Sequence, residues 1–468
     1  MTVAILGENI QGLIAGALLA KRGEQVTILN FPESDPYAEF HSGYKTGPVT
    51  HIPFAMPTYI ADELDLKHYG FEEPAPVENP FEALPFYDGL CVLVEMFQSL
   101  EDNRPPYREK AWRDTWGTFE IGHVLSRYDR DVQDLFARAA TLSLIDLLSA
   151  TDVDEEKKAK MIAAATIGAK TDPSAPGSAA AIIPAIAPFR QKNSYVMKGS
   201  LHNLMHSLKQ AAGSFGAEII SDRSIRKIIV TDGAIQSVIM GDETEYAADH
   251  YVIDHDPVLF FEECLDGYTP PPAFQNRVKS GSNIKNCVSV KVAVSSSLDL
   301  NALIFASDPD YVTTALQDFK GEGGSQYPVL SIENVSRVSS NFAPDGHVVL
   351  DITAQYFSHD LDKEDPILKA VKQALVRVNP DLDGAIVNMS MSPVATQTGL
   401  PTFTGTMPLL PLLKIFGGYH SIAYDCPMGN VLIAGYGEGC VGHHHVHDGG
   451  ERIAFLYDSF KENDKKAS

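Results

Sequence analysis

The sequence predicts an α/β protein whose parallel sheet is assembled from separated segments, with an α+β lobe inserted between them. Three observations predict it: a strand–turn–helix–strand unit at the N-terminus, a return to strands after a helix near residues 196–257, and an apolar strand before glycines near residue 430. The chain has 468 residues, which is too many for one hydrophobic core. We therefore expect a nucleotide-binding domain of the Rossmann type in three pieces and a second domain in two.

The first unit has the order of a βαβ element that opens a parallel sheet. It comprises a strand at Thr2–Leu6, a glycine turn at Gly7–Gly12, a helix at Leu13–Arg22 and a strand at Gln25–Leu29. Small alanines lie on the helix where a sheet would press close, and Gly23 is typical of a helix end.

The later segments repeat this alternation of strands and helices. Further strands are expected at Ala217–Ile220, Arg226–Val230, Ile235–Met240, Glu245–Ala247, Tyr251–Ile253, Val288–Val294, Val348–Thr353 and Asn430–Ala434. Further helices are expected at Asp154–Lys170, Leu201–Gly213, Pro366–Val378 with Asp365 as N-cap, and near Glu451–Phe460. The predicted nucleotide-binding domain therefore takes residues 1–58, 196–257 and 421–468, and the inserted domain takes 59–195 and 258–420.

Composition excludes some classes of function. The net charge of −24 comes from 37 basic and 61 acidic residues, so the chain as a whole repels nucleic acid. The five cysteines are scattered without a CxxC pair, which is typical of a reducing compartment. The first expected strand begins at residue 2 and no stretch is long and apolar enough to span a bilayer, so the expected location is the cytoplasm.

The glycine turn resembles a dinucleotide fingerprint in which two positions are altered. A full fingerprint has three glycines and, about twenty residues on, an acid that grips the ribose hydroxyls. Gly7 and Gly12 keep the first and third glycines, whereas Asn9 takes the second position and Asn30 takes that of the acid. Either the site binds a dinucleotide through weaker contacts, or the fold has kept its shape and lost the ligand.

Stretches along nearly the whole chain resemble the phytoene-desaturase-like flavoproteins, in particular the branch of pyridine nucleotide-disulphide oxidoreductase domain-containing proteins. The stretches are Gly12–Ala20 with Gly23–Val26, Tyr59–Gly70, Lys198–Leu201 with Gly216–Ile219, Ala248–Ile253 and Asn430–Gly437. The resemblance implies an FAD-dependent oxidoreductase of the desaturase, dehydrogenase or oxidase type, with FAD extended along the first domain. It also implies a lipophilic, polyene or amine-like substrate in the second domain.

The resemblance assigns cofactor contacts residue by residue. It implies that the turn residues Gly7, Asn9 and Gly12, together with Asn30, hold the adenosine and pyrophosphate, and that the backbone near Ile225 meets the adenine. The loop of Gly435, Gly437 and Glu438 would follow the ribityl chain. The family's Gly-Gly-basic stretch after the second strand is missing, because Pro32–Tyr44 offers only Gly43. A flavin-fold protein that serves as a non-catalytic binding or assembly subunit is therefore an alternative, and a redox-neutral isomerase that uses reduced flavin is a close variant of the oxidoreductase.

A histidine tract follows the last glycine loop. His443, His444 and His445 are candidates for acid–base catalysis beside the flavin, while His443, His445 and His447 share one face of an extended chain and would suit a metal. The plainer alternative is a polar loop before the last helix, and we predict no metal site. Arg452 either balances cofactor phosphate or lies in the first turn of that helix.

Two apolar segments broken by prolines bear on the substrate and on partners. Ala179–Phe189 and Met407–Phe416 either line a hydrophobic tunnel, dip into a membrane interface as a peripheral contact, or pack in the core. Neither carries the basic face that binds anionic lipid. A small hydrophobic molecule is the expected partner, and a homo-oligomer is a further alternative.

Overall fold

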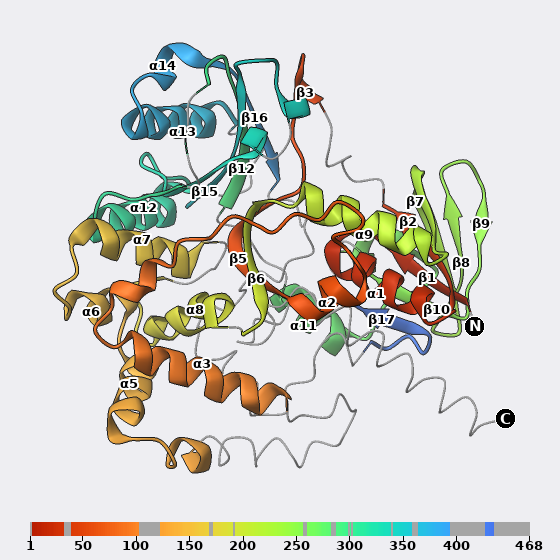
Figure 1. Ribbon diagram of the computed structural model, residues 1–468, viewed down its shortest axis with the longest axis horizontal. Coiled ribbons are helices and arrows are strands. Elements are labelled where there is room, and N and C mark those ends of the chain that lie inside the picture. Colours follow the sequence, from red (N-terminus) through yellow and green to blue (C-terminus); the bar gives the residue numbers. More distant parts are fainter. Residues whose placement is uncertain are drawn as a thin grey trace.

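The computed structural model describes residues 2–31, 39–102, 122–167, 172–190, 192–255, 260–281, 287–297, 300, 303–337, 340–357, 364–393 and 426–434. A mainly parallel sheet lies at one side of the molecule, and an antiparallel sheet with most of the helices lies at the other (Figure 1). A two-stranded antiparallel ribbon, β5 (Val49–Pro57) and β6 (Ser194–Ser200), runs between the two parts.

The first sheet draws its strands from three distant segments of the chain. Its order is β17-β10-β1-β2-β7-β8-β9, and the first five strands are parallel to their neighbours. The bounds are β1 Thr2–Leu6, β2 Gln25–Asn30, β7 Glu218–Thr231, β8 Ala234–Met240, β9 Glu245–Tyr246, β10 His250–Ile253 and β17 Val431–Ile433. The predicted α/β fold class with a Rossmann-type sheet is confirmed.

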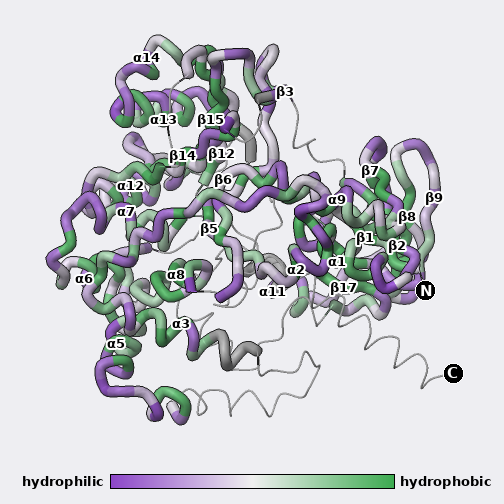
Figure 2. The backbone as a smooth tube through the Cα atoms, in the orientation of Figure 1, coloured by the Kyte–Doolittle hydropathy of each residue, from purple (hydrophilic) through white to green (hydrophobic). Residues whose placement is uncertain are grey.

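Two helices cover one face of this sheet. α1 (Ile10–Lys21) and α9 (His202–Ser214) pack with Val3, Ile5 and Ile28 into one hydrophobic cluster. Alternate residues such as Ala4 and Leu6 face the other way, because successive side chains of a strand point to opposite faces. Figure 2 shows apolar residues concentrated in α1 and the strands beside it.

Some predicted bounds were wrong. The two strands expected at Ala217–Ile220 and Arg226–Val230 form the single bulged strand β7, which pairs with β2 through its first half and with β8 through its second. The helix expected from Pro366 is α13 (Glu364–Val378), so Asp365 lies inside its first turn rather than at the N-cap. An acidic side chain is favourable at either position, which explains the ambiguity.

The second sheet is antiparallel, in the order β13-β14-β15-β12-β16. Its strands are β12 Cys287–Val294, β13 Leu303–Phe305, β14 Leu330–Asn334, β15 Val348–Gln355 and β16 Ile386–Pro393. One face carries Val290, Ile332, Leu350 and their neighbours, which pack against α13. The opposite face is polar, and several of its side chains are also buried.

Six further helices form a separate apolar core beside this sheet. They are α3 Tyr87–Asp102, α5 Arg130–Thr141, α6 Leu144–Ser149, α7 Glu155–Thr166, α8 Ile182–Arg190 and α12 Pro309–Glu322. The segment Ala179–Phe189 lies mostly in α8, and its residues through Pro188, except the half-buried Ala185, are buried in this core, as the packing alternative expected. Met407–Phe416 lies outside the described residues. Within the described ranges, every helix is too short or too polar to cross a bilayer.

Candidate functional site

The glycine turn between β1 and α1 lies against the residue that follows β10. Gly7 has a φ of 125°, and a Cβ there would come within 2.1 Å of the carbonyl oxygen of Asp254. A Cβ on Gly12 would come within 2.3 Å of Oδ2 of Asp254. Contacts this short exclude any side chain, so both glycines are required by the close approach of Asp254.

Asp254 places a carboxyl group at the N-terminus of α1. Its Oδ2 accepts a hydrogen bond from the backbone N–H of Gly12 at 2.8 Å, and its carbonyl oxygen accepts one from Nδ2 of Asn9 at 2.8 Å. The residue is fully buried, and its Oδ1 has no hydrogen-bond partner among the described residues. Burial raises the pKa of Asp254 to about 7, although the backbone amides of Gly12 and Asn9, which point toward the carboxyl group, act to lower it.

The N-cap residue Asn9 makes no side-chain hydrogen bond to the first amides of α1. Asn9 has φ −82° and ψ 172°, which is ordinary extended backbone, so asparagine is not strained at this position. The Glu8 carboxylate turns aside to Lys209 on α9 and to the hydroxyl of Ser221. Ile10 is the first residue of α1, so its N–H has no acceptor within the helix.

Aromatic side chains fill the neighbouring edge of the sheet, beyond the carboxyl ends of β2 and β10. Phe31 stacks on His255 with ring centroids 4.2 Å apart and an interplanar angle of 13°. Burial lowers the pKa of His255 to about 4, so the imidazole is neutral at neutral pH. Ile225, the predicted adenine contact, lies on β7 with its side chain buried in the same cluster as Phe31, and Asn30 ends β2 half-buried.

Several predicted site residues lie outside the described residues. They are Gly435, Gly437, Glu438, His443, His444, His445 and Arg452. Their assigned roles stay predictions. Within the ranges that the structure describes, no group of three or more histidine, cysteine, aspartate or glutamate side chains is arranged to hold a metal ion.

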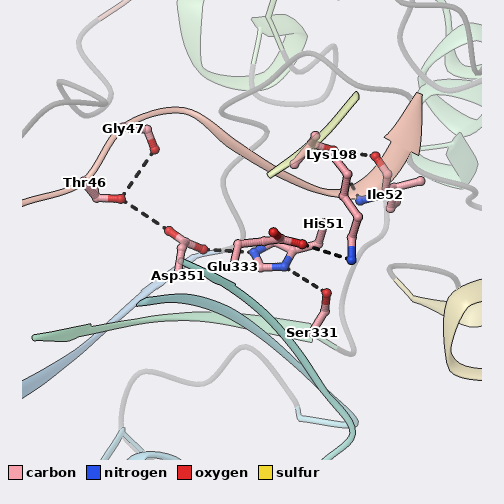
Figure 3. Close-up of polar contacts among 9 residues, drawn as sticks. Thr46, Gly47, His51, Ile52, Lys198, Ser331, Glu333 and Asp351 are labelled. Atoms are coloured by element: carbon pink, nitrogen blue, oxygen red, sulfur yellow. Dashed lines mark hydrogen bonds and ion pairs between the residues drawn. The ribbon is translucent and has the colours of Figure 1, made fainter. Parts of the chain in front are cut away.

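A second polar cluster joins the ribbon to the antiparallel sheet (Figure 3). On β5, Nε2 of His51 lies 3.0 Å from Oδ1 of Asp351 on β15, and its Nδ1 lies 3.1 Å from Oγ of Ser331 on β14. Asp351 also accepts a hydrogen bond from the hydroxyl of Thr46 at 3.4 Å. These side chains come from the buried polar face of the sheet and from the strand that crosses it.

An ion pair completes this cluster. Nζ of Lys198 on β6 lies 3.0 Å from Oε1 of Glu333 on β14, and the side chains are only 10% and 6% exposed. Glu333 and Asp351 are directly opposite each other in the β14–β15 register. Gly199 brings the ribbon backbone close, because a Cβ there would lie 3.0 Å from the Glu333 carboxylate. Each acid of the pair thus has its own basic partner on the ribbon.

The chemical role of this cluster is limited by burial. A hydroxyl, an imidazole and a carboxylate in series form a nucleophilic triad in many hydrolases. Here the Ser331 residue has no exposed surface, so a substrate does not reach its hydroxyl. We interpret the cluster as the polar connection that fixes the ribbon on the sheet.

Sequence reasoning missed these residues for identifiable reasons. Asp254 directly follows the predicted strand Tyr251–Ile253, and ligands of parallel sheets bind at the carboxyl ends of strands, so that position was a usable signal. Glu333 and Asp351 alternate with apolar residues along their strands. Such alternation normally indicates a solvated face, whereas here the ribbon covers it.

The two-lobed arrangement of this chain has counterparts among solved structures. No protein-family model matches the chain, and no curated protein matches it. An oxidoreductase from Methanosarcina mazei superposes with a TM-score of 0.54 at 12% identity, covering 97% of this chain and 99% of that one. The fold is shared with oxidoreductases.

Two further solved structures extend this likeness. Putrescine oxidase bound to putrescine superposes with a TM-score of 0.51 at 14% identity, over 98% of this chain and 99% of that one. A protein from Pyrococcus furiosus gives a TM-score of 0.51 at 13% identity, over 97% of this chain and 96% of that one. At these identities the likeness establishes the architecture of both lobes and leaves the chemistry to the site.

Proposed function

We propose that this chain is an FAD-dependent oxidoreductase that oxidises a C–C or C–N bond of a lipophilic or amine-like substrate. The observation that carries the proposal is the glycine turn of Gly7 and Gly12, which leads into the N-terminus of α1 at the carboxyl edge of a parallel sheet. That position is where dinucleotide pyrophosphates bind in such sheets. Sharing of the whole fold with oxidoreductases supports the choice of reaction class.

The residues present fit a dinucleotide at the pyrophosphate. The first amides of α1, on Ile10 and Gln11, have no intrahelical acceptor and supply hydrogen-bond donors for phosphate oxygens. Glu8 is held away from the helix end by Lys209. The orphaned Oδ1 of Asp254 is a further polar atom at the same end of the helix.

The role of this chain's own residues is to bind the cofactor and to orient it relative to the substrate. When bound, FAD supplies the two-electron acceptor, and no protein side chain is obligatory for the transfer. The α1 dipole and the turn amides would hold the pyrophosphate. The ribbon β5–β6, fixed by the Lys198–Glu333 pair, keeps the antiparallel sheet in a set position relative to the nucleotide domain.

The substrate class follows from two weaker indications. A superposed putrescine oxidase carries putrescine, which favours an amine. The sequence resemblance implies a lipophilic, polyene or amine-like substrate. A redox-neutral isomerase using the same cofactor is compatible with the same binding residues.

A second candidate function has its own observation. Phe31 and His255 stack over the edge where the adenosine would lie, and Asp254 caps the helix end. These contacts favour a flavin-fold protein that serves as a non-catalytic binding or assembly subunit.

Absorption spectroscopy separates the two functions. The protein is purified without added cofactor and its near-ultraviolet and visible spectrum is recorded before and after soaking with FAD and removal of free ligand. Near-stoichiometric flavin bands support the oxidoreductase, and a colourless protein that takes up no FAD supports the binding subunit.

Gly12→Ala, whose methyl group meets Asp254, should lower FAD content at least about tenfold. Gly213→Ala on α9, where a Cβ meets open space, is the matched control and should retain it.

A further inference from the structure

The carboxyl end of β2 lacks the acid that a dinucleotide-binding sheet normally has there. Asn30 takes this position, and it is half-buried. The usual acid accepts a hydrogen bond from the 2′-hydroxyl of the adenosine ribose, and a charged acceptor makes a stronger hydrogen bond than a neutral one. A dinucleotide bound at this edge would therefore gain affinity from a carboxylate that another element supplies.

Glu8 places a carboxylate beside this position. The backbone N–H of Gly7 donates to the carbonyl oxygen of Leu29 at 2.8 Å, so the glycine turn lies directly against the end of β2. Glu8 follows at once in the turn, and its Oε1 accepts a hydrogen bond from the hydroxyl of Ser221 on β7 at 2.5 Å. The same strand pairs with Asn30 shortly after Ser221. Glu8 and Asn30 thus lie at one corner of the sheet.

Two partners orient the Glu8 carboxylate without using all of its hydrogen-bonding capacity. Its Oε2 accepts from Nζ of Lys209 on α9, and its Oε1 accepts from Ser221. A carboxylate has about four lone-pair sites on its two oxygens, so it can accept further hydrogen bonds. The Glu8 side chain keeps 9% of its surface exposed, and Ser221 beside it is exposed, whereas Asp254 has no exposed surface. Of the two acids near the turn, Glu8 is the one that a ligand hydroxyl can reach.

We propose that Glu8 replaces the missing acid after β2 and accepts a hydrogen bond from the 2′-hydroxyl of the adenosine ribose of FAD. This inference rests on the proposed function, because it concerns the same cofactor. Lys209 and Ser221 are positioning residues that hold the carboxylate between α9 and β7, away from the first amides of α1. The chain thus carries its ribose acceptor on the glycine turn instead of on the strand.

The charge of Glu8 distinguishes a ligand contact from a purely structural ion pair. The dinucleotide pyrophosphate is anionic, so a carboxylate that only paired with Lys209 would repel it, and removing that carboxylate would leave FAD binding unchanged or tighter. A carboxylate that accepts a ribose hydroxyl has the opposite effect, because a charge-assisted hydrogen bond is lost with it. Glu8→Gln should therefore raise the Kd for FAD about ten- to a hundredfold.

The decisive test combines this variant with removal of the hydroxyl from the ligand. Titration calorimetry of the full chain, freed of bound flavin, gives the Kd for 2′-deoxy-ADP and for ADP. In the wild-type protein the ratio of these two Kd values should be at least about tenfold, and in Glu8→Gln it should fall to about 1. Glu218→Gln makes the same change at an exposed acid that begins β7, and should keep the wild-type ratio.

A second variant returns the carboxylate to the strand. Glu8→Gln/Asn30→Asp ends β2 with an acid and should raise the ratio again toward the wild-type value. The wild-type comparison of the two ligands needs no variant. A ratio near 1 therefore overturns the proposal even if Glu8→Gln does not fold.

The outcomes distinguish this inference from the proposed function. FAD bound equally tightly by the wild-type protein and Glu8→Gln overturns the inference and leaves the oxidoreductase intact. A ratio that falls in Asn30→Ala and persists in Glu8→Gln assigns the hydroxyl to Asn30 and also overturns the inference. A protein that shows the Glu8-dependent ratio but takes up no FAD supports the ribose contact and overturns the oxidoreductase. A protein that binds neither ADP nor FAD overturns both.

Discussion

Asp254 and His255 are adjacent in the chain. Because both are buried, their contributions to the stability of the fold change in opposite directions as the pH rises. The pKa of Asp254 is raised from 3.8 to about 7, so its contribution to stability is complete below pH 3.8 and is lost as the pH rises through 7. The pKa of His255 is lowered from 6.5 to about 4, so its contribution is complete above pH 6.5 and is lost as the pH falls through 4. Between about pH 4 and pH 6.5 the loss of stability from Asp254 and the gain from His255 partly cancel as the pH rises.

Asp254→Asn should therefore make the free protein more stable at alkaline pH. The uncharged amide removes the cost of burying a carboxylate, which a shift of this size sets at up to about 4 kcal/mol above pH 7. Urea unfolding at a series of pH values measures the difference from wild type, which should shrink steadily as the pH is lowered toward 4. A variant whose stability difference is independent of pH would contradict the assignment.

His255→Phe should have the mirror-image profile. Phenylalanine keeps the ring stack with Phe31 and cannot take up a proton. Relative to wild type, the variant should gain about 2 kcal/mol in free energy of unfolding on going from pH 7.5 to pH 5. The same urea series measures this change, and parallel wild-type and variant curves over that range would show that the imidazole is not the titrating group.

At the scale of single elements, the packing of α1 on the sheet explains its buried glycine, and the predicted start of this helix at Leu13 was wrong, because α1 begins at Ile10 within the predicted turn. A Cβ on Gly16 would lie 2.9 Å from Cδ1 of Ile28 and 3.0 Å from Cδ1 of Ile5, both buried. Gly16→Ala is expected to lower the free energy of unfolding by about 1–2 kcal/mol, because the isoleucines must shift within a packed core. Gly213→Ala, inside α9 but facing open space, should instead raise it by up to about 1 kcal/mol. Urea unfolding of both variants decides whether close packing or helix propensity governs Gly16.

Elements of the nucleotide domain were predictable because their signals are local. The strand Thr2–Leu6 was predicted with its observed bounds, and α9 begins and ends within one residue of the predicted helix. The glycine turn that follows this strand and the order of strands and helices depend on glycines and periodicity within short windows. Asp254 was missed although it follows a predicted strand, because its role depends on a turn that lies far away in the sequence.

At the scale of the whole molecule, the two lobes are connected by contacts that no local pattern reveals. The ribbon β5–β6 brings His51 and Lys198 onto the polar face of the antiparallel sheet, where they meet Asp351 and Glu333 (Figure 3). Each of these strands taken alone indicates a half-solvated surface. Their burial depends on which strands meet, so the sequence predicted the fold class of the second lobe and not this cluster.

The Lys198–Glu333 pair provides the test of this connection. Glu333→Gln leaves the Lys198 ammonium buried without its carboxylate and should cost about 3–5 kcal/mol in free energy of unfolding. The double variant Lys198→Met/Glu333→Met should recover most of that loss, because two well-packed apolar side chains remove both buried charges. Glu73→Gln breaks the exposed Lys67–Glu73 pair, whose side chains are 55% and 63% exposed, and should leave the urea midpoint unchanged. If Glu333→Gln is as mild as this control, the ion pair does not hold the ribbon on the sheet, and the position of the second lobe must depend on its apolar contacts instead.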